Sequence, residues 1–342
     1  MTPEGPVDLL VTTVPFGEAD PEVFGMLEAS GISWRISDEL RRERTPERVA
    51  ATIADARVIV AGTEPYPAAV IAAAPRLEAI CRVGIGLDSV DLLAAERRGV
   101  PVAYTPDGPS DAVAELTVAL VLDVLRGVSR ADRDLRAGSW LRRPGERVAR
   151  STIGLVGLGR IGGRAARRLA GGFPGVRLLA HDLVPDPALD DVVTWVDLDR
   201  LLVESDVVSL HVPRSPATIG MIGAAELARM PSHAALVNTS RGGIVDEDAL
   251  VDALTTGTIR AAAVDVYETE PYAGPLTRVE QATLTCHMGS MTSDCRGRME
   301  REAVEDALRF LAGEPFAQPV PEEEYAMARL EASAADPPGA GG

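Results

Sequence analysis

His287 is the residue of this chain best suited to proton transfer. The sequence holds four histidines, and this one stands in the segment LTCHMGS, at the end of an apolar run that predicts a strand. An imidazole exchanges protons near neutral pH more readily than any other side chain. Glu270, in the preceding segment DVYETEP, could hydrogen-bond the ring and favour its protonated form. The pair predicts exchange of a proton with a substrate oxygen.

Arg241 is the second candidate, as a residue that binds an anion. It stands in NTSRGGIVD, which again follows an apolar strand signal. Its planar guanidinium suits a carboxylate or a 2-oxo acid, and the two glycines after it leave room for a ligand. At the carboxyl end of a parallel strand it would face the ligand crevice.

A glycine-rich turn, GLGRIG, follows the strand signal at 152–156 and precedes a helical pattern. In that context it predicts a dinucleotide site. Gly157 allows the tight turn, Gly159 lets the backbone approach a pyrophosphate, and Gly162 lets the helix pack closely on the strand. Asp182 ends the next strand, where a carboxylate binds ribose hydroxyls and repels a 2′-phosphate. The predicted cofactor is therefore NAD.

The elements around these segments alternate between strand and helix. Strands are predicted at 7–14, 58–61, 77–83 and 100–103, and helices at 22–29, 49–54, 67–74 and 92–98. After a Pro/Gly cluster at 106–110, one long helix is predicted over 111–136. Further strands follow at 177–180, 193–195, 207–210, 235–238, 262–266 and 282–285, with helices at 198–203, 224–229 and 247–256. This alternation predicts parallel α/β sheets.

The predicted fold is α/β, with two doubly wound parallel-sheet domains. A Rossmann NAD-binding domain over 106–290 is inserted into a flavodoxin-like substrate domain made of 1–105 and 291–320. The apolar stripe of a final helix, 295–312, predicts that this helix returns to pack on the first domain. Residues 321–342, rich in Glu, Pro and Gly, are predicted to be disordered.

Composition excludes several classes of partner. The formal net charge of −17 disfavours nucleic acid and anionic membrane surfaces, so a small anionic ligand needs local arginine. No apolar run is long enough to span a membrane, and the start lacks the pattern of a signal peptide. Three scattered cysteines form neither a disulfide framework nor a metal site, which is typical of a cytoplasmic protein.

In order and spacing, these segments resemble the D-2-hydroxyacid dehydrogenase family from about Leu9 to Pro319. GTEPY at 62–66 and the Arg82 segment are similar to its phosphoglycerate dehydrogenase-like branch. The resemblance implies an NAD-dependent oxidoreductase that transfers a hydride between nicotinamide and a small D-2-hydroxy acid or 2-oxo acid. It also implies a homodimer, and a phosphate or phosphonate group on the substrate is one option.

The resemblance assigns a role to each site residue. Arg241 binds the substrate and polarises its carbonyl, Glu270 rather than Glu268 supports the histidine, and His287 is the acid or base. Substrate binding through the backbone is assigned to Arg82, Val83, Gly84 and Ile85. Cofactor binding is assigned, beyond the three glycines and Asp182, to Arg160, Ile161, Val212, Pro213, Thr239, Ser240, Asp265 and Gly289.

The sequence departs from the family pattern at Cys286, where a proline usually precedes the histidine. This puts a thiol beside the acid or base, while the alternative is a buried small apolar residue. Two other functions stay open. One is an NAD(H)-sensing protein similar to the transcriptional corepressors that share this fold, and the other is oxidation of a small inorganic anion such as phosphite.

Overall fold

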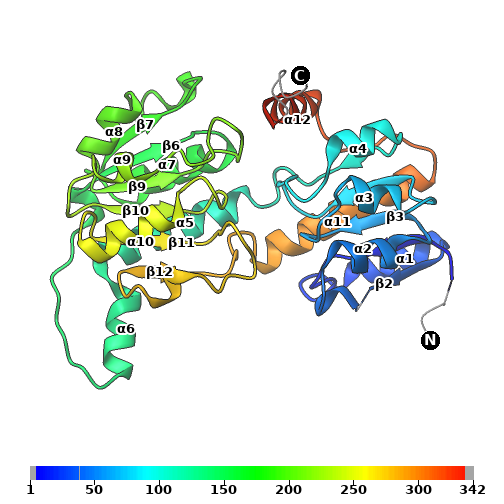
Figure 1. Cartoon of the computed structure of the whole chain (residues 1–342), viewed down its shortest axis with the longest axis horizontal. Helices are drawn as coiled ribbons and strands as arrows, with labels where there is room; N and C mark the ends of the chain where they lie inside the picture. Colours follow the sequence, from blue (N-terminus) through cyan, green and yellow to red (C-terminus); the bar gives the residue numbers. More distant parts are fainter. Residues whose placement is uncertain (1–4, 38, 336–342) are drawn as a thin grey trace, which may run out of the picture. The chain divides into compact units, whose positions relative to one another are not determined.

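The computed structural model describes residues 5–37 and 39–335, and the chain forms two compact units (Figure 1). Unit 1 consists of Met1–Pro109 and Ser290–Gly342, and unit 2 of Ser110–Gly289. Each unit is built on a parallel sheet with its own hydrophobic core. The predicted fold class, two doubly wound parallel-sheet domains, is confirmed.

The sheet of unit 1 has five parallel strands in the order β2-β1-β3-β4-β5. Its strands are β1 (Val7–Val11), β2 (Trp34–Ile36), β3 (Ala56–Ala61), β4 (Ala79–Arg82) and β5 (Val102–Ala103). The apolar residues of β1 and β3 are buried, as expected of strands covered on both faces, while Asp8 and Arg57 within them are half-buried. β2 was not predicted from the sequence, because three half-buried residues at a sheet edge carry no periodic signal.

The described part of unit 1 contains seven helical segments. They are α1 (Glu22–Ser30), η1 (Glu39–Arg41), α2 (Pro46–Ile53), α3 (Ala68–Ala72), α4 (Leu92–Arg97), α11 (Ser293–Leu311) and α12 (Glu322–Ala335). α11 contacts β3 and β4, as its apolar stripe predicted. The prediction of disorder over 321–342 is wrong for α12, whose Tyr325 and Ala328 pack on the core of unit 1. Residues 336–342 lie outside the described residues.

The sheet of unit 2 has seven parallel strands in the order β12-β11-β10-β9-β6-β7-β8. They are β6 (Thr152–Val156), β7 (Arg177–His181), β8 (Thr194–Trp195), β9 (Val207–Leu210), β10 (Ala235–Asn238), β11 (Ala261–Val264) and β12 (Ala282–Leu284). The order reverses between β6 and β9, so a crevice for a ligand is expected outside the carboxyl ends of these strands. Hydrophobic clusters cover both faces of the sheet.

The helices of unit 2 connect these strands. They are α5 (Ser110–Arg126), α6 (Val128–Arg136), α7 (Arg160–Gly172), α8 (Leu198–Glu204), α9 (Ala224–Leu227) and α10 (Glu247–Thr256), with short 3-10 turns at Val148–Arg150, Pro187–Leu189 and Pro275–Arg278. The predicted single helix over 111–136 is two helices. Gly127 separates them because its φ of 62° is left-handed and cannot continue a right-handed helix.

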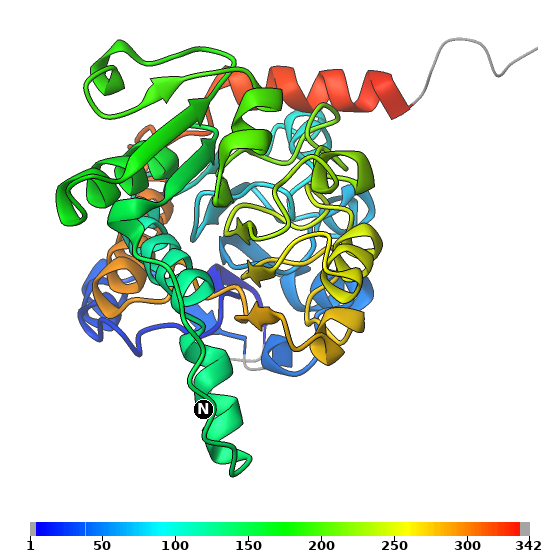
Figure 2. The same ribbon diagram turned by 90° about the vertical axis from the view of Figure 1, so that its left-hand side faces the viewer.

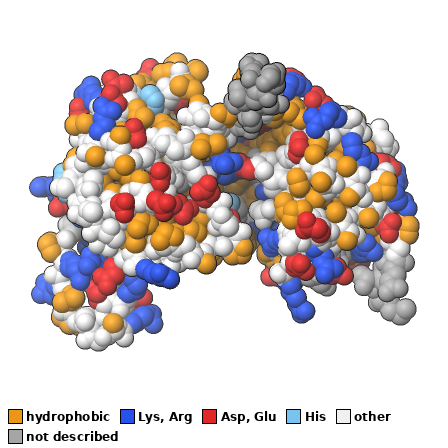
Figure 3. Space-filling view, viewed as in Figure 1, with side chains coloured by type: hydrophobic (Ala, Val, Ile, Leu, Met, Phe, Trp, Pro, Cys, Tyr) orange, Lys and Arg blue, Asp and Glu red, His pale blue; other side chains and the backbone are white. Residues whose placement is uncertain are grey.

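α6 and the loop after it, residues 128–147, form an arm that extends from the rest of unit 2 (Figure 2). No residue of α6 is buried, and Val128, Leu135, Trp140 and Leu141 are exposed on the arm. Its surface mixes basic, acidic and hydrophobic side chains, at the lower left of Figure 3. The apolar residues of this arm are therefore not used by the core of its own unit.

Two features are absent from residues 5–37 and 39–335. No helix there combines the length and the apolar composition needed to cross a membrane. Nor does that part of the chain bring together three or more His, Cys, Asp or Glu side chains as a metal site.

Candidate active site

The glycine-rich turn lies between β6 and α7, at the point where the strand order of unit 2 reverses. Gly157 has a φ of 86°, and its amide donates to the carbonyl oxygen of His181 at 2.9 Å. A Cβ at Gly162 would lie 2.0 Å from the carbonyl oxygen of Gly157, so this position admits only glycine. A Cβ at Gly159, at the start of α7, would meet no atom within 4 Å. The turn is thus tight, closely packed and open on the side of the helix N-terminus, which fits a dinucleotide pyrophosphate.

Asp182 follows β7 and lies beside this turn. Its Oδ2 accepts a hydrogen bond from the amide of Leu158 at 2.6 Å, and its Oδ1 accepts one from the amide of Val184 at 3.1 Å. The two bonds fix the carboxylate at the carboxyl edge of the sheet. Binding of the ribose by Asp182 stays a prediction.

His287 and Glu270 are hydrogen-bonded to each other through their side chains. The Nδ1 of His287 lies 2.8 Å from Oε2 of Glu270, and the other carboxylate oxygen accepts the amide of Tyr267 at 3.0 Å. His287 has a φ of 51°, an uncommon left-handed backbone for a residue other than glycine. Glu268 contacts a different segment, since its amide donates to the carboxylate of Glu247. The geometry therefore pairs the histidine with Glu270, as expected.

The environment of Glu270 favours its ionised form. Burial by itself would raise the pKa of this carboxyl, but the hydrogen bonds from His287 and from the Tyr267 amide outweigh it. The positive charge of Arg241 acts in the same direction, and the pKa of Glu270 lies below its usual value. A carboxylate held in this way can stabilise a protonated imidazole.

Asp265 holds the loop that carries His287. It is 1% exposed, and its carboxylate accepts hydrogen bonds from the Thr285 hydroxyl at 2.6 Å and from the amides of Met288 and Gly289 at 2.9 and 3.0 Å. Its carbonyl oxygen accepts the amide of His287 at 2.8 Å. Sequence reasoning assigned Asp265 to the cofactor and did not foresee this positioning role. The loop partner Thr285 was also missed, because nothing in its sequence context distinguishes it.

Arg241 follows β10 in a segment that is held by hydrogen bonds among its own residues. Asn238 accepts hydrogen bonds from the amide and the hydroxyl of Ser240 at 3.1 and 2.7 Å, and its side-chain nitrogen donates to the carbonyl oxygen of Arg241 at 3.0 Å. A Cβ at Gly242 would lie 1.9 Å from the carbonyl oxygen of Tyr267. The segments after β10 and β11, which carry Arg241 and Glu270, are therefore locked together at one edge of the sheet.

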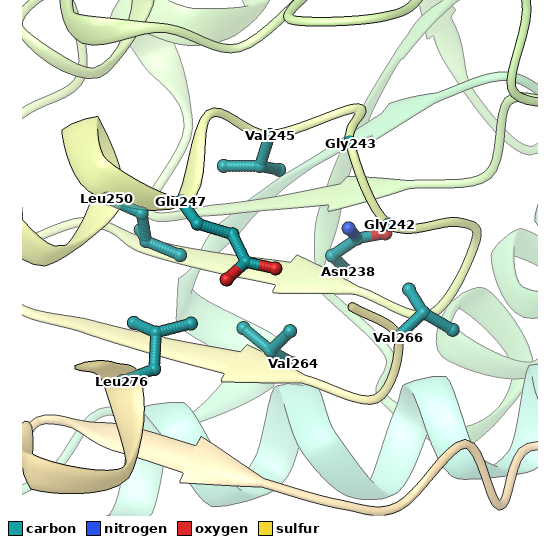
Figure 4. Close-up of a pocket in the computed structure, with 9 residues that line it drawn as sticks. All are labelled: Asn238, Gly242, Gly243, Val245, Glu247, Leu250, Val264, Val266 and Leu276. Atoms are coloured by element: carbon teal, nitrogen blue, oxygen red, sulfur yellow. The ribbon is translucent and has the colours of Figure 1, made fainter. Parts of the chain in front are cut away.

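A small cavity lies behind the Arg241 segment (Figure 4). Its volume is about 10 Å³, and Asn238 and Glu247 are the polar side chains among its lining. A space of this size holds at most a single water molecule. It is too small for an organic substrate and is a packing feature of unit 2.

The segment after β4 in unit 1 was predicted to bind the substrate through backbone amides. The amide of Val83 already donates to the carbonyl oxygen of Ala61 at 2.9 Å, and that of Gly84 donates to the Thr105 hydroxyl at 2.7 Å. Arg82 is buried, and its guanidinium donates to the carbonyl oxygen of Val83. Among the four predicted residues, Ile85 keeps an amide that donates to no described residue.

The remaining predicted cofactor residues lie at the carboxyl edge of the unit 2 sheet. Arg160 and Ile161 open α7, while Val212 and Pro213 follow β9. The hydroxyl of Thr239 lies 2.9 Å from that of Thr117 on α5, and Ser240 is buried beside it. Cys286 is exposed, so the alternative of a buried apolar residue is wrong.

His211 is a functional candidate that sequence reasoning did not single out. It follows β9 directly, and its Cβ lies 3.3 Å from the position of a Cβ on Gly162. Its Nε2 lies 3.0 Å from the Ser209 hydroxyl. Burial of the ring lowers the pKa of His211 from 6.5 to about 4, so the imidazole is neutral beside the glycine turn.

Comparison with known proteins agrees with this geometry. Residues 118–289 match the family described as D-isomer specific 2-hydroxyacid dehydrogenase, NAD binding domain. The chain belongs to the D-2-hydroxyacid dehydrogenase family. The predicted family is therefore confirmed, and so is the prediction that unit 2 is a domain of the NAD-binding type.

Two relatives show the range of this dehydrogenase family. The chain is 40% identical over 263 residues to the glyoxylate reductase of Thermofilum pendens, covering 74% of this chain and 77% of that protein. It is 39% identical over 277 residues to the D-3-phosphoglycerate dehydrogenase of Mycobacterium leprae, covering 80% of this chain and 52% of that protein. The chain thus spans about half the length of the phosphoglycerate dehydrogenase that it matches.

Solved structures of similar proteins cover nearly the whole chain. The TT0316 protein of Thermus thermophilus superposes with a TM-score of 0.82 at 34% identity, over 92% of this chain and 100% of that one. The D-lactate dehydrogenase of Aquifex aeolicus, in complex with NAD and lactic acid, has a TM-score of 0.78 at 26% identity, over 90% and 96% of the two chains.

Proposed function

We propose that the chain catalyses the NAD-dependent interconversion of a small D-2-hydroxy acid and its 2-oxo acid. The observation that carries the proposal is the 2.8 Å hydrogen bond between His287 and Glu270, on a loop that Asp265 holds in place. Relatives named glyoxylate reductase and hydroxypyruvate reductase support this class of substrate.

His287 exchanges the proton in this proposal. Because its Nδ1 is bound to Glu270, the Nε2 is the ring nitrogen left for the substrate. In the reductive direction Nε2–H donates to the carbonyl oxygen of the 2-oxo acid, and in the oxidative direction Nε2 accepts the hydroxyl proton. Glu270 stabilises the protonated ring in both directions.

Arg241 binds the carboxylate of the substrate and stabilises the negative charge that develops on its carbonyl oxygen. In unit 1, the amides of Ile85 and Gly86 are the ones proposed to bind an anion, since those of Val83 and Gly84 are engaged within that unit. Arg82 supports this loop through its bond to Val83. The substrate is therefore a small anion.

NAD fits the cradle formed by Gly157, Gly159 and Gly162, with Asp182 beside it. When bound as NADH, it supplies the hydride for reduction of the 2-oxo acid. Residues proposed to hold it also include Arg160, Ile161, Val212, Pro213, Thr239, Ser240 and Gly289. Asp265 would contribute to NAD binding indirectly, by holding the loop that ends at Gly289.

Oxidation of NADH against a panel of 2-oxo acids tests the proposal. The panel pairs glyoxylate, pyruvate and hydroxypyruvate with acids that carry a phosphate or a phosphonate, since a relative named D-3-phosphoglycerate dehydrogenase keeps that option open. Arg241→Ala is expected to lower kcat/KM at least about hundredfold with the protein still folded. A flat response across the panel would instead favour an NAD(H)-sensing binding protein.

The protein is further proposed to be a homodimer that works in the cytoplasm. Exposed apolar residues on the arm, Trp140 and Leu141 among them, support a protein–protein interface. All three cysteines, Cys81, Cys286 and Cys295, are free, which suits a reducing compartment.

A further inference from the structure

Asp123 is a buried acid near the end of α5 that has no part in the proton transfer proposed above. It is 9% exposed, and its two carboxylate oxygens contact two different elements of unit 2. Oδ1 accepts the amide of Ser129, in the first turn of α6, at 2.7 Å. Oδ2 accepts the hydroxyl of Thr283, on β12, at 2.6 Å. Burial of a carboxylate is costly unless donors satisfy its oxygens, and these two bonds do so. Asp123 therefore joins the junction of α5 and α6 to strand β12.

Strand β12 lies at the edge of the unit 2 sheet, where it is paired with β11 on one side. It is three residues long, so few ladder hydrogen bonds fix its position. Its middle residue is Thr283, which lies opposite Ala263 of β11. The bond from Asp123 holds this middle residue through its side chain, in addition to the ladder.

A second contact acts on the segment just before β12. Nη2 of Arg133, on α6, donates to the carbonyl oxygen of Glu280 at 2.9 Å. Ser129 and Arg133 lie four positions apart, so they share one side of α6. The left-handed backbone of Gly127 turns the chain between α5 and α6, which lets α6 take a direction of its own. The two helices thus hold β12 at its middle and just before its start.

β12 leads directly into the loop that carries His287. The pairing with β11 continues to Thr285, whose amide donates to the carbonyl oxygen of Val264 at 3.0 Å. The hydroxyl of Thr285 donates to Asp265, and His287 follows two residues later. Thr283 and Thr285 are alternate residues of an extended segment, so their side chains lie on the same face of the sheet. A shift of β12 against β11 would therefore move the imidazole relative to the rest of the site.

We propose that Asp123 is a positioning residue of the active site, which acts on His287 through Thr283 and β12. Proton transfer requires the ring nitrogen to lie within hydrogen-bond reach of the substrate oxygen, and a displacement of about 1 Å can lower the rate about 100-fold. The bond between Asp123 and Thr283 sets the rate of this step. It does not set the affinity for NADH, whose proposed cradle lies between β6 and α7. This inference rests on the proposed dehydrogenase function.

Two changes at Thr283 test this role. Thr283→Val keeps the shape of the side chain and removes the hydroxyl, and it is expected to lower kcat about tenfold while the Kd for NADH stays within about twofold. Thr283→Ser keeps the hydroxyl, so its kcat should lie within about twofold of the wild type. Thr277→Val is the matched control, since the hydroxyl of Thr277 donates to Gly274 in an exposed turn. The assays are steady-state reduction of the 2-oxo acid on which the wild type is most active, and quenching of tryptophan fluorescence by NADH.

Changes at Asp123 provide a second comparison. Asp123→Asn can keep both contacts, because the Thr283 hydroxyl accepts as well as donates, and its kcat should lie within about threefold of the wild type. Asp123→Ala loses both contacts and should lower kcat at least about tenfold. Thr283→Val added to Asp123→Ala should cause no further loss, since the two changes remove the same bond.

Hydrogen exchange over residues 282–289 follows the loop without turnover, and it should be about tenfold faster in Thr283→Val than in Thr283→Ser. A wild-type kcat in Thr283→Val, or an equal loss of kcat in Thr283→Val and Thr283→Ser, would overturn the positioning role while leaving the dehydrogenase intact. If Asp123→Ala does not fold, the two Thr283 variants decide. No oxidation of NADH by the wild type with any 2-oxo acid would overturn the proposed function and the catalytic role of Asp123 with it, even if the difference in exchange were found.

Discussion

The carboxylate of Asp265 accepts a hydrogen bond from the main-chain amide of Gly289 at 3.0 Å. Together with its bonds to Thr285 and Met288, this contact closes the loop around His287 from the end of the neighbouring strand. The acid that follows β11 thus determines where the proposed acid–base residue stands.

Replacing Asp265 with asparagine should disturb this loop. The amide nitrogen of Asp265→Asn cannot accept the hydrogen bonds that one carboxylate oxygen receives, so a buried donor of the loop loses its partner. We expect stability to fall by about 2 kcal/mol in urea unfolding and kcat to fall about 10- to 100-fold. Asp248→Asn, on the exposed side of α10, is the control. Wild-type turnover in Asp265→Asn would contradict the positioning role.

Glu270→Gln should lower the rate of reduction. The variant removes the carboxylate that lies 2.8 Å from Nδ1 of His287, so the ring is no longer held for proton donation to the substrate. We expect kcat for reduction to fall about 100-fold at neutral pH. The measurement is kcat and kcat/KM for reduction between pH 5 and 9.

Glu268→Gln serves as the control for that experiment, since Glu268 is exposed and does not contact His287. Its kcat should match that of the wild type. If Glu268→Gln lowered kcat and Glu270→Gln did not, the contact between His287 and Glu270 would have no role in catalysis.

Much of the site could be predicted because its chemistry is encoded locally. Arg241, Glu270 and His287 each follow an apolar strand, and the carboxyl ends of parallel strands share one edge of a sheet. The alternation of strands and helices likewise predicted both sheets. What the sequence did not reveal depends on contacts between distant segments. The carboxylate of Asp265 accepts hydrogen bonds from residues 20 or more positions later. Nothing in the sequence near Asp265 indicates that Thr285 and Gly289 donate to it.

The missed elements have similar causes. A lone glycine inside a helical pattern is usually tolerated, so only the left-handed backbone of Gly127 marks the break between α5 and α6. α12 begins with three glutamates, which are typical of a disordered acidic tail. Its stability comes from packing of Tyr325 and from the ion pair between Arg329 and Glu96 on α4.

His211 should make the stability of the fold depend on pH. Burial lowers its pKa from 6.5 to about 4, so between these values the unfolded chain binds a proton that the folded chain does not. Stability from this group is present above pH 6.5 and is lost as pH falls toward 4, by up to about 3 kcal/mol. His211→Gln, neutral in both states, should flatten that part of the profile in urea unfolding at pH 5 and 7. An equal loss of stability between pH 7 and pH 5 in the wild type and in His211→Gln would contradict this role of His211. His233→Gln, at an exposed position, is the control.

The arm offers a test of the proposed homodimer. Trp140 is 79% exposed and Leu141 is 52% exposed, so both would be covered if the arm pairs with a second copy. The double change Trp140→Ser and Leu141→Ser is expected to convert a dimer into a monomer in sedimentation velocity. Leu330→Ser, at a residue 70% exposed on α12, should leave the dimer intact. A monomeric wild type, or dissociation by the control alone, would argue against this interface.

Substitutions at Gly162 and Gly159 should have different effects, the first on stability and the second on cofactor binding. Gly162→Ala places a methyl group 2.0 Å from the carbonyl oxygen of Gly157, so the turn or α7 must shift, at a cost of about 2–3 kcal/mol. Gly159→Ala meets no atom within 4 Å, and it should keep the stability of the wild type. Its methyl group instead stands where backbone approaches the pyrophosphate, and we expect the Kd for NADH to rise about tenfold.

Urea unfolding and quenching of tryptophan fluorescence by NADH measure these two effects separately. Gly171→Ala, near the end of α7, also meets no atom within 4 Å; it should leave the Kd for NADH unchanged and raise stability by no more than about 1 kcal/mol. If Gly159→Ala bound NADH as tightly as Gly171→Ala, the open face of the turn would not be the place of the pyrophosphate. Because the contrast is made within one turn and one helix, a general loss of helix stability cannot imitate it.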